Sequence, residues 1–149
     1  MDKTNKITIT CNNWDERVDI SQAVADMLKI NMLGIDDYII RGSVMNGDLD
    51  EFPKEAFVSQ YGENLFSVLE NLSYMAYVKT VDEPFVISID DIKNESNAPI
   101  LRETISIDVN DNTKTLSSAI SDYTIKKEKS ASATAKKIAN IVLSDERWG

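Results

Sequence analysis

The sequence predicts an α+β domain: a mostly antiparallel sheet of about five strands with helices packed on one face, and a C-terminal helical segment. Three observations predict it. Apolar and polar residues alternate over Ile7–Cys11 and Glu103–Val109, which is typical of half-buried strands. Apolar residues recur at helical spacing over Ile20–Leu28. Two short strand-like segments, 75–81 and 85–89, follow each other closely enough to form a hairpin.

The first strand is followed by a predicted helix over residues 20–33. Asp19 is a suitable N-cap residue with Gln22 three positions on, and Gly34 can adopt the left-handed conformation that ends a helix. A second strand is expected over residues 38–45, before the turn dipeptide Asn46-Gly47.

Pro53 fits the first turn of a helix, and apolar residues keep near-helical spacing from there to Leu72. Gly62 lies inside this run, so either one weakened helix or two short ones are expected. In the hairpin that follows, Asp82-Glu83-Pro84 supplies the turn.

The strand over Glu103–Val109 is expected to have one wet face, formed by Thr104, Ser106 and Asp108. Helical spacing returns near residue 116 and again over residues 135–142. We therefore divide the chain into a single α+β domain over residues 1–125 and a lysine-rich helical extension over residues 126–149, which can pack on that domain.

The composition excludes several kinds of chemistry. The 149 residues contain no histidine and one cysteine, Cys11, which removes the histidine-based nucleophilic and metal mechanisms and any intrachain disulfide. No glycine-rich phosphate loop and no long apolar span is present. We expect a cytoplasmic protein with no cofactor, no metal and no catalytic residues, and interpret Cys11 as a core residue.

Charge is unevenly distributed. The net charge is −9, yet residues 126–137 hold five lysines against one glutamate, a local +4 that leaves −13 on the rest of the chain. Such an acidic body repels nucleic acid and anionic membranes and attracts basic proteins. The predicted partner is therefore a basic or nucleic-acid-binding protein, and pairing of the acidic body with the lysine-rich end makes a homo-oligomer possible.

The candidate partner-binding residues are acidic side chains in predicted loops and one terminal aromatic anchor. They are Asp36, Asp37, Asp48, Asp50, Glu51, Asp90, Asp91 and Trp148. The Asp48 cluster and the Asp108-x-Asn110-x-Asn112 segment resemble calcium loops only weakly, because neither has the glycine and glutamate of an EF-hand. If the pairs at 36–37 and 90–91 met at one sheet edge, they could bind a metal for phosphoryl chemistry. Trp148 packs either on its own helix or in a partner pocket.

The function predicted from these observations is a non-enzymatic, acidic binding protein that masks a basic partner, of the inhibitor, immunity or phage anti-defence type. In its sharper form, carboxylates imitate the phosphates of nucleic acid. A structural subunit of a larger assembly, such as a virion or secretion apparatus, is the second hypothesis, and a carboxylate–metal enzyme is the last.

Overall fold

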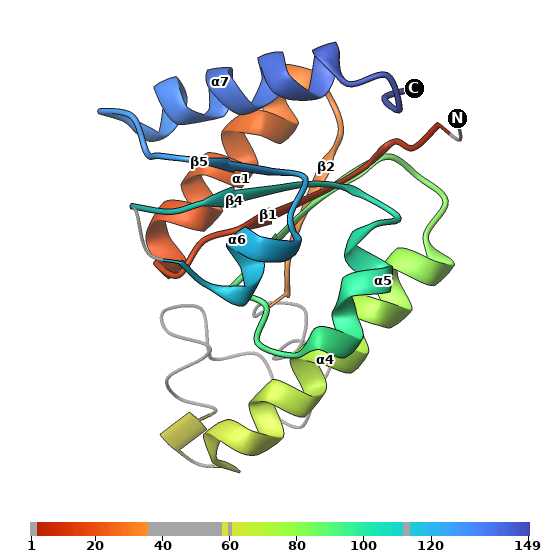
Figure 1. Cartoon of the computed structure of the whole chain (residues 1–149), viewed down its shortest axis with the longest axis vertical. Coiled ribbons are helices and arrows are strands. Elements are labelled where there is room, and N and C mark those ends of the chain that lie inside the picture. Colours follow the sequence, from red (N-terminus) through yellow and green to blue (C-terminus); the bar gives the residue numbers. More distant parts are fainter. Residues whose placement is uncertain (1–2, 36–57, 60, 112–113) are drawn as a thin grey trace.

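The computed structural model describes residues 3–35, 58–59, 61–111 and 114–149. Its centre is a five-stranded sheet in the order β2-β3-β1-β4-β5, in which every neighbouring pair is parallel (Figure 1). The strands are β1 (Lys6–Thr10), β2 (Asn31–Gly34), β3 (Phe85–Ile89), β4 (Ile105–Val109) and β5 (Tyr123–Ile125).

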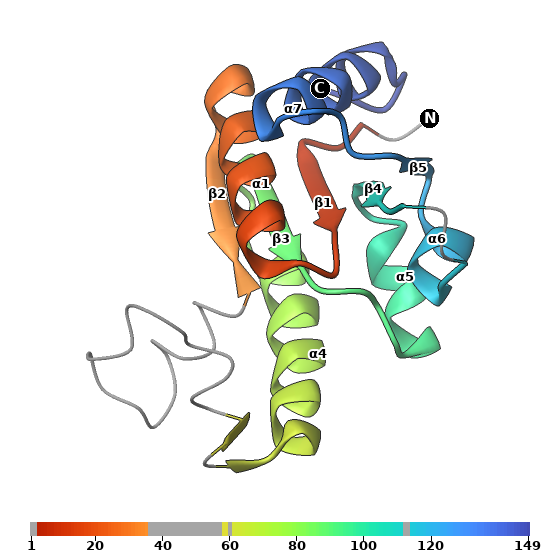
Figure 2. The same ribbon diagram turned by 90° about the vertical axis from the view of Figure 1, so that its left-hand side faces the viewer.

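The prediction of a mostly antiparallel sheet with helices on one face is therefore wrong. Helices cover both faces of the central strands (Figure 2). One face packs against α1 (Trp14–Leu28) and α7 (Ala131–Ser144), and the other against α4 (Glu63–Thr80) and α5 (Ala98–Leu101). A 3₁₀ turn, η1 (Glu95–Asn97), precedes α5, and α6 (Leu116–Ile120) connects β4 to β5. Parallel strands need such crossover helices, which is why parallel sheets are buried on both sides.

The predicted hairpin does not exist. Residues 75–80 form the last turns of α4, where Tyr74 and Val78 lie on the buried side of the helix. Gly62, with φ of +92°, is the N-cap residue of α4, and residues 58–59 and 61 before it are also helical, so the helical run is interrupted at this glycine as the sequence predicts. Bulky residues over 75–81 are typical of a strand, but here they belong to a helix whose buried side packs on the sheet.

Helix α1 begins earlier and ends earlier than the sequence predicts. Its N-cap is Asn13 rather than Asp19, and the Asn13 side chain accepts a hydrogen bond of 3.0 Å from the backbone N–H of Glu16. Lys29, with φ of +59°, is the left-handed residue that ends α1, whereas Gly34, the predicted helix end, is the last residue of β2.

The predicted strand over residues 38–45, the turn Asn46-Gly47 and the helix start at Pro53 lie outside the described residues. In the part of the chain that the structure covers, no helix is both long and apolar enough to cross a bilayer. The apolar residues of α7 lie in the same core as those of α1 and β1; they are Ala135, Ile138 and Val142.

Candidate functional site

The carboxyl ends of β1, β3 and β4 face one side of the molecule, and the loops that follow them enclose a crevice. After β1 the chain turns toward β2 on one side of the sheet, whereas β4 leads to β5 on the other. Open parallel sheets bind ligands where connections diverge in this way. The fold therefore places the candidate site beyond the ends of these three strands.

Three hollows line this edge and share residues. The smallest, about 60 Å³, lies among Cys11, Asn12, Asp91 and Lys127 and has room for several water molecules. A second, of about 510 Å³, also includes Asn12 and continues past Arg17 to Asp90. A third, of about 620 Å³, includes Asp90 and runs along α4.

The second and third hollows, which meet at Asp90 and Glu63, are large enough for small organic ligands. The crevice is thus continuous and divided into parts, with Asp90 lining two of them.

The connection from β1 to α1 is short. Residues Cys11, Asn12 and Asn13 make up the whole of it. Because the Asn13 side chain already accepts the N–H of Glu16, one of the N–H groups that a helix start offers to an anion is occupied. Arg17 is buried one turn into α1, and its guanidinium donates to the carbonyl of Cys11 at 3.2 Å.

Acidic side chains follow β3 and β4. The Asp90 carboxylate accepts the N–H of Asp91 at 2.7 Å, which fixes its orientation at the strand end. Burial raises the pKa of Asp91, and the negative charges of Asp108 and Asp90 raise it further. The charges of these three carboxylates therefore influence one another at the ends of β3 and β4, and perturbed pKa values of this kind are frequent at functional sites.

Asp108 lies deeper and is fully buried. Its carboxylate accepts a 2.6 Å hydrogen bond from the hydroxyl of Thr10 and a 3.2 Å bond from the amide of Asn110. The prediction that one face of this strand contacts solvent is therefore wrong, since Thr104, Ser106 and Asp108 are all at most 1% exposed.

Lys127, in the segment that follows β5, closes the small hollow. Its ammonium group lies 2.6 Å from a carboxylate oxygen of Glu16 and 3.1 Å from one of Asp111. Hydrogen bonds to these two carboxylates raise the pKa of Lys127, so that it is fully charged at neutral pH. It joins the start of α1 to the end of β4 across the mouth of the crevice.

Cys11 contributes a buried thiol, as its alternation with Ile7 and Ile9 predicts. Burial raises the pKa of this thiol, which disfavours the reactive thiolate. The thiol is packed in the core cluster around β1.

Of the residues predicted from sequence, Asp90 and Asp91 lie in the crevice. Asp36, Asp37, Asp48, Asp50 and Glu51 lie outside the described residues, so the meeting of the two aspartate pairs stays a prediction. Trp148 is partly buried and packs on the core cluster that contains α1 and α7.

Sequence reasoning missed Arg17 and Lys127 because their roles depend on which strand ends lie side by side. Only the parallel strand order brings their segments together.

Within the described residues, no group of three or more carboxylate or thiol side chains is arranged to hold a metal ion.

No protein-family model and no curated protein sequence matches the chain. Solved structures do. The chain is similar to the shikimate kinase of Acinetobacter baumannii in complex with shikimate, with a TM-score of 0.77 and 15% identity over 95% of this chain and 94% of that one. The match to the shikimate kinase of Aquifex aeolicus has a TM-score of 0.75 and 13% identity, and it covers 97% of this chain and 99% of that one. The match to the dephospho-CoA kinase of Campylobacter jejuni has a TM-score of 0.51 and 12% identity, and it covers 93% of this chain and 96% of that one.

The chain departs from the phosphate-binding motif of such folds. That motif places G-x-x-x-x-G-K-[ST] between a strand and a helix. Here three residues without glycine or lysine stand in that place. The absence of this loop was read correctly from the sequence, but the fold was not.

These comparisons overturn the predicted function. The sequence predicted a non-enzymatic inhibitor, immunity or anti-defence protein, whereas the solved structures that resemble almost the whole chain are kinases. With a parallel sheet in the order β2-β3-β1-β4-β5 and a crevice at its carboxyl edge, this chain has the fold of the shikimate kinases.

Proposed function

We propose that this chain is an enzyme that transfers a phosphoryl group from a nucleoside triphosphate to a hydroxyl group of a small polar acceptor. The observation that carries the proposal is the divided crevice at the carboxyl edge, in which Asp90 lines both large hollows. A phosphoryl-transfer site has to hold a donor and an acceptor side by side, with little covalent chemistry of its own. The kinase fold of the similar structures supports this class of reaction.

Asp90 is the residue we assign as general base. In the reaction, the acceptor oxygen forms a bond to the terminal phosphorus, the bond from that phosphorus to the leaving diphosphate breaks, and the hydroxyl proton passes to the Asp90 carboxylate. The N–H of Asp91 donates to one Asp90 oxygen at 2.7 Å, and a carboxylate can accept several hydrogen bonds, including one from a substrate hydroxyl.

The donor has to be held without a glycine-rich cradle. Lys127 and Arg17 are the cations that line the crevice nearest the start of α1. An incoming phosphate competes with Glu16 and Asp111 for Lys127, and both of these ion pairs are partly exposed, where such pairs contribute little free energy. Exchange of partners at Lys127 therefore costs little.

A magnesium ion normally accompanies a nucleoside triphosphate. It needs only one or two carboxylates from the protein, because phosphate oxygens and waters complete its shell. Asp91 fits this role, since burial and the nearby charges of Asp108 and Asp90 raise its pKa, and a cation would stabilise its ionised form. When bound, the ion would neutralise charge on the phosphate oxygens.

The acceptor is a small hydroxylated molecule. Most residues that line the hollow along α4 are polar or charged, among them Asn64, Ser67, Asn71 and Lys93. Shikimate, which the Acinetobacter baumannii enzyme binds, is the first compound to test. We place the reaction in the cytoplasm, which suits a chain whose one cysteine is a free thiol.

The proposal is tested first by binding and then by transfer. ATP with magnesium should shift amide NMR signals of residues 11–13, 90–91 and 127 in a saturable way. Transfer of labelled phosphate from ATP to shikimate and to other small polyols should then be measured, with Asp90→Asn expected to lower the rate by about 10²-fold or more. Asp82→Asn, in the loop before β3, removes the same charge outside the crevice and should keep the rate.

No saturable ATP binding at millimolar concentration would overturn the proposal. So would an equal rate in the two asparagine variants.

A further inference from the structure

We propose that the amino edge of the sheet, on the side away from the crevice, holds a binding site for a small phosphate-bearing anion. A hollow of about 420 Å³ opens there between the two ends of the chain and the segment that leads into β4. Its basic lining residues are Lys3, Lys6, Arg102 and Arg147. Glu103 is the one acidic side chain among its lining residues.

The excess of positive charge is unusual for this molecule. The chain carries 16 basic and 25 acidic residues, whereas the four basic residues around this hollow outnumber its two acidic groups, the Glu103 side chain and the terminal carboxylate of Gly149. A local field of this sign concentrates anions at the hollow although the protein as a whole repels them.

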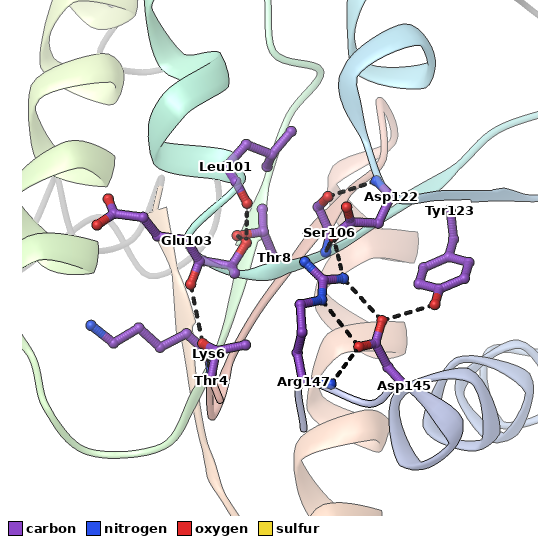
Figure 3. Close-up of polar contacts among 11 residues, drawn as sticks. Thr4, Lys6, Thr8, Leu101, Glu103, Ser106, Asp122, Tyr123, Asp145 and Arg147 are labelled. Carbon is purple, nitrogen blue, oxygen red and sulfur yellow. Dashed lines mark hydrogen bonds and ion pairs between the residues drawn. The ribbon is translucent and has the colours of Figure 1, made fainter. Parts of the chain in front are cut away.

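Two of the charged lining groups are already neutralised. The guanidinium of Arg147 lies 2.9 Å from carboxylate oxygens of both Asp122 and Asp145, as Figure 3 shows. Glu103 forms an ion pair with Lys79 at 3.2 Å. The acidic lining residue is therefore compensated by a cation from α4.

The other three cations keep their charge. The ammonium groups of Lys3 and Lys6 donate to the backbone carbonyls of Glu146 and Val78, at 2.8 and 2.7 Å. A carbonyl orients an ammonium group without cancelling its charge, and each ammonium has two further donors. Among the described residues, Arg102 has no carboxylate within ion-pair distance.

The backbone around the hollow is fixed by pairing of the chain ends. Thr4 N–H donates to the carbonyl of Arg147 at 2.6 Å, and Gly149 N–H donates to the carbonyl of Thr4 at 3.2 Å. These bonds form an isolated parallel bridge between Thr4 and Trp148, and Lys3 and Arg147 directly precede its two residues. Thr4 Oγ1 donates to the carbonyl of Glu103 and links this bridge to the segment that leads into β4.

The chemistry points to an oxyanion. Lysine ammonium groups and an arginine fork are the donors that phosphate groups prefer, and the hollow offers few apolar side chains for a large organic body. Its size suits a phosphorylated small molecule better than a single hydrated ion. Because the site lies at the amino edge, it uses none of the residues assigned to the crevice.

The test is a titration with inorganic pyrophosphate at constant ionic strength, followed by amide NMR. We expect saturable shifts at residues 3–6, 102–103 and 147–149. A Lys3→Gln/Arg102→Gln double variant should weaken binding by about tenfold or more, because each exposed cation is removed without touching the core. The matched control is Lys136→Gln/Lys137→Gln on α7, which removes the same charge elsewhere and should keep the affinity.

Equal weakening in both double variants would show that pyrophosphate binding depends on net charge alone. Shifts confined to the crevice residues would show that pyrophosphate binds there instead. Either result would reject the proposal. Loss of pyrophosphate binding at the amino edge leaves ATP binding at the crevice unaffected, so the two proposals fail separately. A shift of the thermal midpoint by pyrophosphate in the wild-type chain, absent in the Lys3/Arg102 variant, gives a second readout of the same site.

Discussion

The hydroxyl of Thr10 on β1 donates a 2.6 Å hydrogen bond to the carboxylate of Asp108 on β4, and both side chains are completely buried. This bond joins the two strands whose ends flank the crevice. A buried carboxylate is tolerated only where donors satisfy it, and the amide of Asn110 is the other donor shown for Asp108.

Replacing Thr10 with valine should therefore destabilise the fold. Valine has nearly the same shape but no hydroxyl group, so Asp108 would lose its shortest hydrogen bond inside the protein. We expect the free energy of unfolding to fall by about 1.5–3 kcal/mol, the range for hydrogen bonds to charged groups. Urea unfolding followed by circular dichroism measures this change.

Thr124→Val on β5 is the matched control, because Thr124 is exposed and its hydroxyl makes only a long contact of 3.3 Å. It should change the free energy of unfolding by less than about 0.5 kcal/mol. Equal losses in the two variants would mean that the effect comes from β-propensity rather than from the bond to Asp108.

The same region explains why the sequence predicted the wrong kind of sheet. Polar residues at Thr104, Ser106 and Asp108 alternate with isoleucine and valine, which is the pattern of a strand with one face in water. Each of these polar groups instead finds a partner inside the protein: Thr104 bonds Thr8, Ser106 bonds the backbone of Asp122, and Asp108 bonds Thr10. Alternation cannot distinguish solvent from a buried polar partner on a distant strand.

Local signals were more reliable where the cause is local. The alternation over residues 7–11 found β1 to within one residue, and helical spacing found the buried side of α1 at Ile20 and Val24. The capping residue was missed because both Asn13 and Asp19 are chemically suitable, and only the position of β1 decides which one starts the helix. Arg17 could have been noticed as a cation inside an apolar helix face, but the crevice it enters is formed by strands far apart in sequence.

Tyr74 provides a second buried polar contact across the sheet. Its hydroxyl lies 2.8 Å from the hydroxyl of Thr8, and burial raises the pKa of Tyr74 well above its ordinary value of 10. The folded protein therefore keeps the phenol neutral at a pH where the unfolded chain ionises it. Its contribution to stability is complete below pH 10 and is lost as the pH rises above that value.

We expect Tyr74→Phe to lower the free energy of unfolding by about 1 kcal/mol at pH 7 and to flatten the alkaline loss of stability by up to about 1.4 kcal/mol per pH unit above pH 10. Urea titrations at pH 7 and at several values between 9 and 11 measure both effects. Tyr61→Phe, at an exposed tyrosine just before α4, should keep the alkaline slope of the wild type. An unchanged slope in Tyr74→Phe would contradict the assignment of the buried phenol.

The ion pair of Asp145 with Arg147 makes the opposite prediction at low pH. The guanidinium donates to both carboxylate oxygens, from Nε at 3.1 Å and from Nη2 at 2.9 Å, and Tyr123 adds a third bond of 2.8 Å (Figure 3). Hydrogen bonds from Arg147 hold the pKa of Asp145 far below its ordinary value of 3.8. A lowered pKa stabilises the fold above pH 4, and this contribution disappears as the pH falls below that value.

Asp145→Asn should therefore lower the free energy of unfolding by about 2 kcal/mol at pH 7, where the bidentate pair is complete, and by much less near pH 2. Glu146→Gln, at the exposed neighbour whose backbone carbonyl accepts from Lys3, removes the same charge without touching the pair and should change little at either pH. Urea unfolding at pH 7, 4 and 2 compares the three proteins. A loss in Asp145→Asn that stays constant from pH 7 to pH 2 would show that the asparagine disturbs packing, because an effect of the charged pair must decrease as the carboxylate of the unfolded wild-type chain takes up its proton.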